Sequence, residues 1–165
     1  MVGLERVATR LVEPADEERL AHMWPRLSPR TVYRRFHGPV RSFPATSVHR
    51  LVAADHQEYD AIVAVVDDEI VGVVRYECDR DDPSRAEFAL VVQDDWQGVG
   101  LGGRLMDEVL TLARSRGVTT LIGALLAENR PMLRLLQRHV PGAPLRLHDG
   151  VYEVAVPLGS DPPGR

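Results

Sequence analysis

The chain has 165 residues, of which 44% are apolar and 27% charged, and its net charge is −4 at neutral pH. This composition is typical of an ordinary globular domain, and the acidic balance argues against a nucleic-acid-binding protein, which would present a basic face. Because Cys78 is the only cysteine, an intramolecular disulfide is excluded. No apolar run is long enough to cross a bilayer and the first residues lack a signal peptide's apolar stretch, so we expect a cytoplasmic protein without a membrane partner.

The N-terminal third predicts one strand followed by short helices. A β-rich run at 7–12 precedes Asp16, which is a good N-cap for a helix over 17–24. Ser28 followed by Pro29 predicts the start of a second helix, which Gly38-Pro39 would end. A third short helix is expected over 46–54.

The remaining two thirds predict strands that alternate with helices. Asp67-Asp68 joins two β-rich runs as a hairpin turn would, and Gly117 is placed to end a long amphipathic helix. The expected strands are 61–66, 69–76, 85–92, 118–126, 145–147 and 151–157, and the expected helices are 101–115 and 129–140. We therefore expect one α/β domain over 1–158 and a disordered tail over 159–165.

The segment from Ala86 to Arg104 carries the strongest functional signal. A strand leads into a polar corner, a glycine-rich turn and then a long amphipathic helix. Glycines allow the backbone to approach a ligand closely, and the N-terminus of the following helix favours negative charge. This arrangement predicts an anion site suited to a pyrophosphate.

Two other nucleotide-binding motifs fit this turn less well. Residues 98–103 satisfy the dinucleotide pattern G-x-G-x-x-G, but residues 93–97 separate the strand from the first glycine, and too little chain follows for a doubly wound domain. A P-loop is excluded, because all 20 Lys+Arg residues are arginine and no lysine follows the glycines.

The turn resembles that of a known family. Gln97-Gly98-Val99-Gly100-Leu101-Gly102 fits the Q/R-x-x-G-x-G/A signature of the GNAT superfamily of N-acetyltransferases, and Leu90-Val91-Val92 looks like the splayed fourth strand of that family. The predicted order of elements matches the family over nearly the whole chain. The resemblance implies an α/β (α+β) fold with a mixed central sheet, splayed fourth and fifth strands and about four flanking helices. It also implies acetyl-CoA as cosubstrate and no metal.

The resemblance further implies where acetyl-CoA would bind. Backbone N–H groups of the glycine-rich turn would hold the pyrophosphate, and main-chain groups of the strand would pair with the pantetheine arm. Asn129 stands where the family often has an asparagine that contacts this arm, and an N-cap of the following helix explains it equally well. The implied cofactor-binding residues are Leu90, Val91, Val92, Gln97, Gly98, Val99, Gly100, Leu101, Gly102, Gly103, Arg104 and Asn129.

Glu87 is the candidate general base. An amine attacks a thioester only when neutral, and a free lysine amine has a pKa of about 10.4, so some group must accept its proton. Glu87 lies near the start of an apolar strand, where a lone buried carboxylate would be costly without a purpose. The alternative is that Glu87 lies at the strand edge and pairs with Arg75, and the residues alone leave both interpretations open.

A closer resemblance favours the first interpretation. The segments 27–36, 70–76, 86–89 and 96–98 together are similar to the bacterial protein-lysine acetyltransferases of the Pat type, in which a glutamate on this strand is the base. Two departures stand out: Leu136 replaces the tyrosine that often protonates the leaving thiolate, and His139-Val140-Pro141-Gly142 replaces the usual Gly-Phe. Because a thiol titrates near pH 8.5, water would suffice as the proton donor.

The acceptor-side wall of this fold would come from the second helix and the loop after it. Tyr33, Arg34, Phe36 and His37 are the candidate substrate-binding residues there, with core packing and a solvated face as the alternative explanation. The histidines lack metal-ligand spacing, so no metal is implied.

The sequence therefore predicts an acetyl-CoA-dependent N-acetyltransferase in which a primary amine attacks directly. The expected acceptor is a protein lysine. A small-molecule amine as acceptor, or a catalytically weak acetyl-CoA-binding sensor, are the alternatives. We expect no nucleic-acid partner, and homodimerisation is left open.

Overall fold

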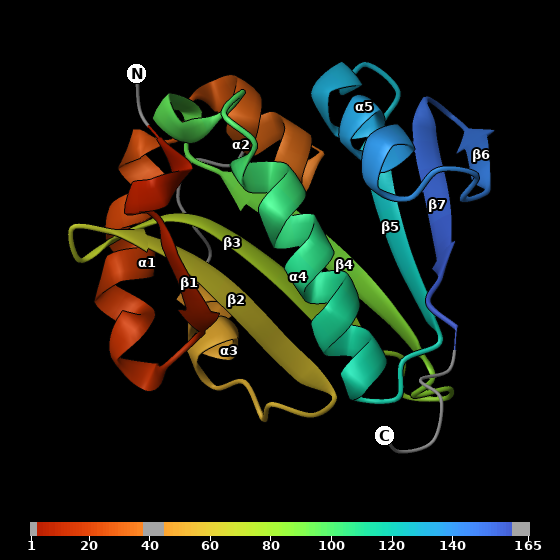
Figure 1. The fold of residues 1–165 in the computed structure, drawn as a ribbon, viewed down its shortest axis with the longest axis horizontal. Coiled ribbons are helices and arrows are strands. Elements are labelled where there is room, and N and C mark those ends of the chain that lie inside the picture. The colour runs from red at the N-terminus through yellow and green to blue at the C-terminus, as the bar shows by residue number, and fades with distance from the viewer. Residues whose placement is uncertain (1–2, 38–44, 160–165) are drawn as a thin grey trace.

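The computed structural model describes residues 3–37 and 45–159, with a seven-stranded sheet of order β1-β2-β3-β4-β5-β7-β6 at its centre (Figure 1). The first four strands form an antiparallel meander: β1 (Ala8–Leu11), β2 (Tyr59–Val66), β3 (Glu69–Cys78) and β4 (Arg85–Val92). The second part of the sheet contains β5 (Thr120–Leu126), β6 (Leu145–His148) and β7 (Val151–Pro157). Since β5 runs parallel to β4 and antiparallel to β7, the sheet is mixed, which confirms the predicted fold class.

Helices cover both faces of the sheet, and each face has its own apolar core. On one face lie α4 (Leu101–Ser115) and α5 (Arg130–His139), and Leu105, Met106 and Val109 of α4 are fully buried there. On the other face lie α1 (Glu17–Met23), α2 (Pro29–Phe36) and α3 (Ala45–Val52), which share a second apolar core with residues of β2, β3 and β4; α1 packs against β3, and α2 against β4 and β5. The described part of the chain thus holds five α-helices, close to the four expected. None of them is long and apolar enough to span a membrane.

Local sequence signals explain where several elements begin and end. Asp67 and Asp68 both adopt positive φ, 49° and 65°, as the tight hairpin between β2 and β3 requires. Ser28 caps α2 by accepting a hydrogen bond from the Thr31 N–H at 3.2 Å, and Pro29 occupies the first turn. His37, in a left-handed conformation, ends α2. The helix stop expected at Gly38-Pro39, and residues 160–165 of the expected tail, lie outside the described residues.

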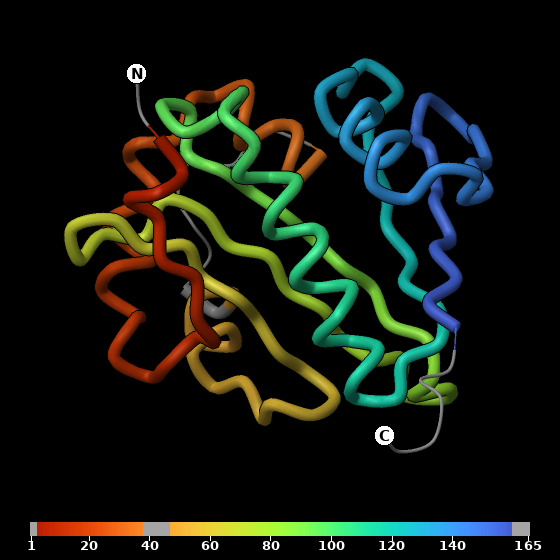
Figure 2. Tube along the Cα trace, in the orientation of Figure 1, coloured from red at the N-terminus to blue at the C-terminus, as the bar shows by residue number. Residues whose placement is uncertain are grey.

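The sheet opens between β4 and β5, and this opening positions the site. β4 pairs with β5 only from Arg85–Thr120 to Glu87–Ile122, whereas its pairing with β3 continues to Val92. Beyond Glu87 the two strands diverge toward the end of the molecule where α4 begins (Figure 2). The predicted splay of the fourth and fifth strands is therefore confirmed, and it leaves one edge of β4 without a strand partner.

Candidate active site

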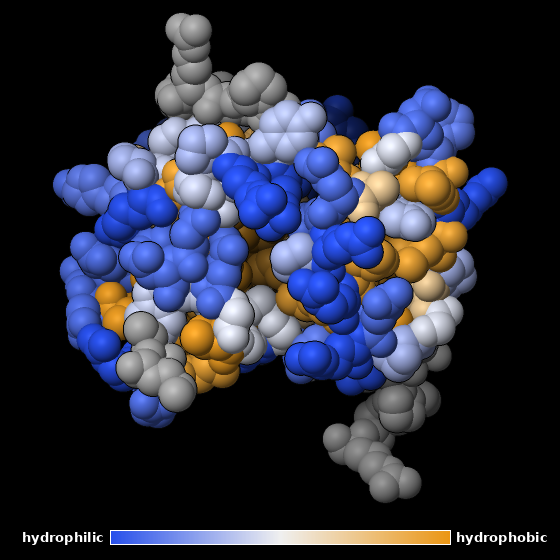
Figure 3. Space-filling model, turned by 90° about the horizontal axis from the view of Figure 1, so that it is seen from above, coloured by the Kyte–Doolittle hydropathy of each residue, from blue (hydrophilic) through white to orange (hydrophobic). Residues whose placement is uncertain are grey.

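A cavity of about 690 Å³ occupies the splay. Its walls come from the end of β4, the glycine-rich turn, β5, α2 and α5. From above, Figure 3 shows apolar surface within the hollow and hydrophilic residues on either side of it. An elongated ligand with a charged end and an apolar arm fits a cavity of this size and character.

The turn before α4 lines this cavity through its glycines. Gly98 and Gly100 adopt φ values of 75° and 95°, which residues with a Cβ rarely adopt. No side chain caps the N-terminus of α4, and its first turn contains no acidic residue. The first N–H groups of a helix have no intrahelical partner, and the helix dipole favours an anion there. The turn therefore has the features of an anion site that suits a pyrophosphate.

Gly102 and Gly103 also have a packing role that the sequence did not reveal. A Cβ on Gly102 would lie 2.9 Å from Leu135 Cδ1, and one on Gly103 would collide with the His139 ring. The two glycines therefore let α5 pack directly against the first turn of α4. Leu135 and His139 both line the cavity, so this packing also shapes the wall of the site.

Three of the residues expected in the cofactor cradle lie outside the cavity lining, namely Val99, Leu101 and Arg104. Leu101 is fully buried in the core. The Arg104 N–H donates to the Gly100 carbonyl at 3.1 Å, and its guanidinium donates to the Val7 carbonyl at 3.0 Å. Arg104 thus tethers α4 to the segment before β1, and neither its amide nor its side chain is available to a phosphate.

The Gln97 side chain is fixed by hydrogen bonds within the protein. Its Nε2 donates to the Val92 carbonyl at 2.8 Å and to Thr31 Oγ1 at 3.0 Å. The side chain therefore connects the glycine-rich turn with β4 and α2, and the Val92 carbonyl already has a partner. Leu90 and Val91, by contrast, lie on the part of β4 whose edge faces the opening.

The carboxylate of Glu87 lines the cavity at the last β4 position that pairs with β5. The expectation of a buried carboxylate is wrong, because 68% of the side chain is exposed. Its Oε1 lies 3.4 Å from Arg75 Nη2 on β3, which is the pairing considered as the alternative. Exposure results from the alternation of the strand, since Phe88 on the opposite face is buried in the core. The Glu87 carboxylate is therefore accessible from the cavity and at the same time lies near Arg75.

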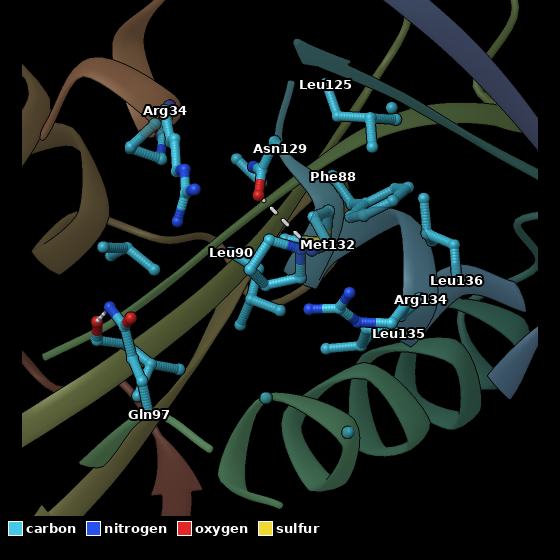
Figure 4. Close-up of a pocket in the computed structure, with 18 of the residues that line it drawn as sticks. Arg34, Phe88, Leu90, Gln97, Leu125, Asn129, Met132, Arg134, Leu135 and Leu136 are labelled. Carbon is cyan, nitrogen blue, oxygen red and sulfur yellow. Dashed lines mark hydrogen bonds between the residues drawn. The ribbon is translucent and has the colours of Figure 1, made fainter. Parts of the chain in front are cut away.

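The α2 wall contains most of the residues predicted for acceptor binding. Arg34, Phe36 and His37 line the cavity, and Arg34 points into it in Figure 4. Tyr33 does not line it, and 41% of this side chain is exposed. Arg35, which lies between Arg34 and Phe36 in the sequence, also lines the cavity.

The α5 wall is built around Asn129. Its Oδ1 accepts a hydrogen bond from the Met132 N–H at 3.3 Å, so the N-cap interpretation holds in the structure (Figure 4). Asn129 also lines the cavity and is buried. Met132, Arg134 and Leu136 line the cavity from the same helix. The apolar spacing of α5 was the signal that would have identified Met132 and Leu136.

Comparison with known proteins defines the class. The model of the acetyltransferase (GNAT) family matches residues 20–140, and the chain belongs to this family. Acetyltransferase PA5475 of Pseudomonas aeruginosa is 33% identical over 130 residues, which cover 76% of this chain and 69% of that protein.

Two further proteins place the chain near the Pat enzymes. Acetyltransferase Pat of Mycolicibacterium smegmatis is 30% identical over 133 residues, which cover 78% of this chain but 39% of that longer protein. The GNAT domain of S. lividans PAT has a TM-score of 0.84 and 26% identity, with 92% of this chain and 90% of that chain covered. The protein is thus a GNAT N-acetyltransferase with acetyl-CoA as its cosubstrate. No group of three or more metal-ligating side chains occurs in the described ranges 3–37 and 45–159.

Proposed function

We propose that this enzyme acetylates lysine side chains of proteins and that Glu87 is the general base. The single observation that carries the proposal is the position of Glu87, whose accessible carboxylate lines the cavity where β4 and β5 part. A general base must reach the proton that it accepts, either directly or through one water molecule. Acetyl-CoA supplies an acetyl thioester to the site, and the rest of the chemistry is positioning and proton transfer by the chain.

Different residues of the chain bind acetyl-CoA and transfer the proton. The turn at Gly98 and Gly100, with the open N-terminus of α4, holds the pyrophosphate. The free edge of β4 near Leu90 aligns the pantetheine arm in the splay. Glu87 accepts the proton of the acceptor ammonium so that the neutral amine attacks, and water protonates the leaving thiolate, since Leu136 has no proton to give.

The charge of the cavity favours a lysine over a polycationic small molecule. Among the described residues, its lining includes four arginines, Arg34, Arg35, Arg134 and Arg138, and one carboxylate, that of Glu87. Polyamines and aminoglycosides carry several positive charges and would be repelled by this wall. A lysine side chain brings one charge, which Glu87 neutralises on proton transfer. The similarity to Pat-type enzymes supports the same acceptor.

The proposal is tested by thiol release from acetyl-CoA with lysine-containing peptides, comparing wild type with Glu87→Gln. We expect kcat to fall about 100-fold at neutral pH, while the acetyl-CoA Kd stays unchanged. The loss should shrink as the pH approaches the lysine pKa of about 10.4, because the amine is then neutral without help.

Glu77→Gln is the matched control for this test. Glu77 lies opposite Glu87 in the β3–β4 register and also lies near Arg75, but it does not line the cavity. Equal effects of the two substitutions would show that Glu87 acts through the charge network and not as the base. Tight acetyl-CoA binding without acetylation of any amine would favour a sensor instead.

A further inference from the structure

Arg35 is a cavity-lining guanidinium without a carboxylate partner in the described part of the chain. It projects from α2, and its Cζ lies over the Phe36 ring at 4.7 Å from the ring centroid. The side chain is half-buried. The segment 38–44, which follows α2 in sequence, contains no aspartate or glutamate that would provide a partner.

Two carboxylates on the adjacent strands β3 and β4 are already paired with other arginines. Glu77 forms an ion pair with Arg50 and lies 4.0 Å from Arg75, and Glu87 lies 3.4 Å from Arg75. These two carboxylates therefore face two guanidinium groups before Arg35 is counted. Arg35 is the third cation of this acceptor-side cluster, and it leaves the cluster with one uncompensated positive charge.

The surroundings of Arg35 disfavour its charged form. Burial, together with the nearby positive charge of Arg75, lowers the pKa of Arg35 to about 10, although Tyr59 and Glu87 oppose this shift. Removing an unpaired cation from water is costly, and a carboxylate that joins it with good hydrogen-bond geometry offsets this cost. Guanidinium groups bind carboxylates through two parallel hydrogen bonds, which makes arginine well suited to this task.

We infer that the acceptor presents a carboxylate next to its reacting amine, and that Arg35 binds this carboxylate as a specificity-determining residue. The inference rests on the proposed function, so the carboxylate belongs to an aspartate or glutamate beside the target lysine. Glu87 and Arg35 then share the acceptor: Glu87 faces the ammonium group and Arg35 faces the acid. This arrangement selects acidic lysine-containing segments over neutral or basic ones.

Paired peptides provide the test. One set carries a glutamate at each position next to a single lysine, and the second set carries glutamine at the same position. We expect the best glutamate peptide to bind the CoA-loaded enzyme about tenfold more tightly than its glutamine partner, and to have a correspondingly lower KM with similar kcat. In Arg35→Met the Kd values of the glutamate and glutamine peptides should become equal. In Arg35→Lys part of the preference for the glutamate peptide should return.

Arg30→Met is the matched control, because it removes a positive charge from the same helix at an exposed position outside the cavity. It should leave the glutamate-to-glutamine ratio intact. Thermal unfolding of each variant separates loss of folding from loss of recognition. Equal binding of both peptide sets by the wild type, or an equal loss for both sets in Arg35→Met, would overturn the inference.

Failure of the proposed function gives a different result. If neither peptide set binds or is acetylated, protein lysine is not the acceptor, and the same comparison is made between free lysine and cadaverine, which differ only by a carboxylate. An Arg35-dependent preference for lysine would support the role of Arg35 with a small acceptor. Absence of that preference would overturn it.

Discussion

Asp94 Oδ1 accepts a hydrogen bond from the Ser28 backbone N–H at 2.7 Å, which ties the start of α2 to the loop before α4. Asp94 Oδ2 also accepts from the hydroxyls of Ser28 and Thr31, at 2.7 Å and 3.0 Å. The loop that leads to the glycine-rich turn and the helix that lines one side of the cavity are thus joined through one carboxylate. These hydrogen bonds therefore couple the position of α2 to that of the loop before α4.

Asp94→Asn should reveal this connection as a pH-dependent loss of stability. Burial alone would raise the pKa of Asp94, but hydrogen bonds from the Ser28 N–H and from the two hydroxyls outweigh it, so the pKa is lowered. A carboxylate with a lowered folded-state pKa contributes stability above its unfolded pKa of about 3.9, and this contribution is lost as the pH falls through the folded pKa. We expect Asp94→Asn to reduce the free energy of unfolding at pH 7 by about 1–2 kcal/mol.

Urea unfolding between acidic and neutral pH measures this effect. The difference in free energy of unfolding between wild type and Asp94→Asn should be constant near neutral pH. It should disappear in strong acid, where both side chains are uncharged. The neighbouring Asp95→Asn is the control, because Asp95 is exposed. A gap that persists unchanged in strong acid would contradict a role for the Asp94 charge.

Gly98→Ala should separate ligand binding from backbone strain. Gly98 and Gly117 both have positive φ, 75° and 87°, and a Cβ on either would meet no atom within 4 Å. Each substitution should therefore cost about 1 kcal/mol of stability through the left-handed backbone alone. Because only Gly98 lines the cavity, only Gly98→Ala should weaken acetyl-CoA binding, by about tenfold. Calorimetric titration with acetyl-CoA checks this, and equal affinities would exclude Gly98 from the phosphate cradle.

Arg104→Met should weaken the fold without weakening acetyl-CoA binding. The Arg104 guanidinium donates to the Val7 carbonyl at 3.0 Å and to Thr9 Oγ1 at 3.2 Å, and it pairs with Glu108. Loss of these contacts should lower the free energy of unfolding by about 1–2 kcal/mol. The acetyl-CoA Kd should change less than about twofold. A large loss of acetyl-CoA affinity in a folded Arg104→Met variant would show that Arg104 does contribute to cofactor binding.

Arg116→Met should destabilise the protein more than its combination with Asp60→Asn. The Asp60 side chain is fully buried, and its carboxylate lies 3.5 Å from Arg116 Nη2 and 2.8 Å from His56 Nδ1. Removing Arg116 leaves a buried charge less compensated, at a cost of about 3 kcal/mol. In the double variant no carboxylate charge remains, so part of this stability should return. Denaturant unfolding of the wild type, both single variants and the double variant measures these free energies. If the losses of the two single variants simply add up in the double variant, the charge explanation is ruled out.

The sequence by itself determined the elements and the acetyl-CoA turn. Apolar spacing predicted α4 from Leu101 to Ser115, the residues that it occupies in the structure, because periodicity and helix-ending glycines are local signals. The hairpin at Asp67-Asp68 and the cap at Ser28 were predicted for the same reason. The open helix N-terminus behind Gly98 and Gly100 likewise follows from short-range conformational rules.

Only the tertiary structure decided what each polar side chain contacts. Gln97 meets Thr31 across 66 positions of sequence, and Arg104 meets Val7 across 97, so both are held by the protein itself. The surroundings of Arg35 depend on how α2 packs over β4 and β5, and the pairing of Glu87 with Arg75 depends on the register of β3 and β4. Hydrogen bonds and charge interactions act through space over a few ångströms, and chain order does not encode those distances.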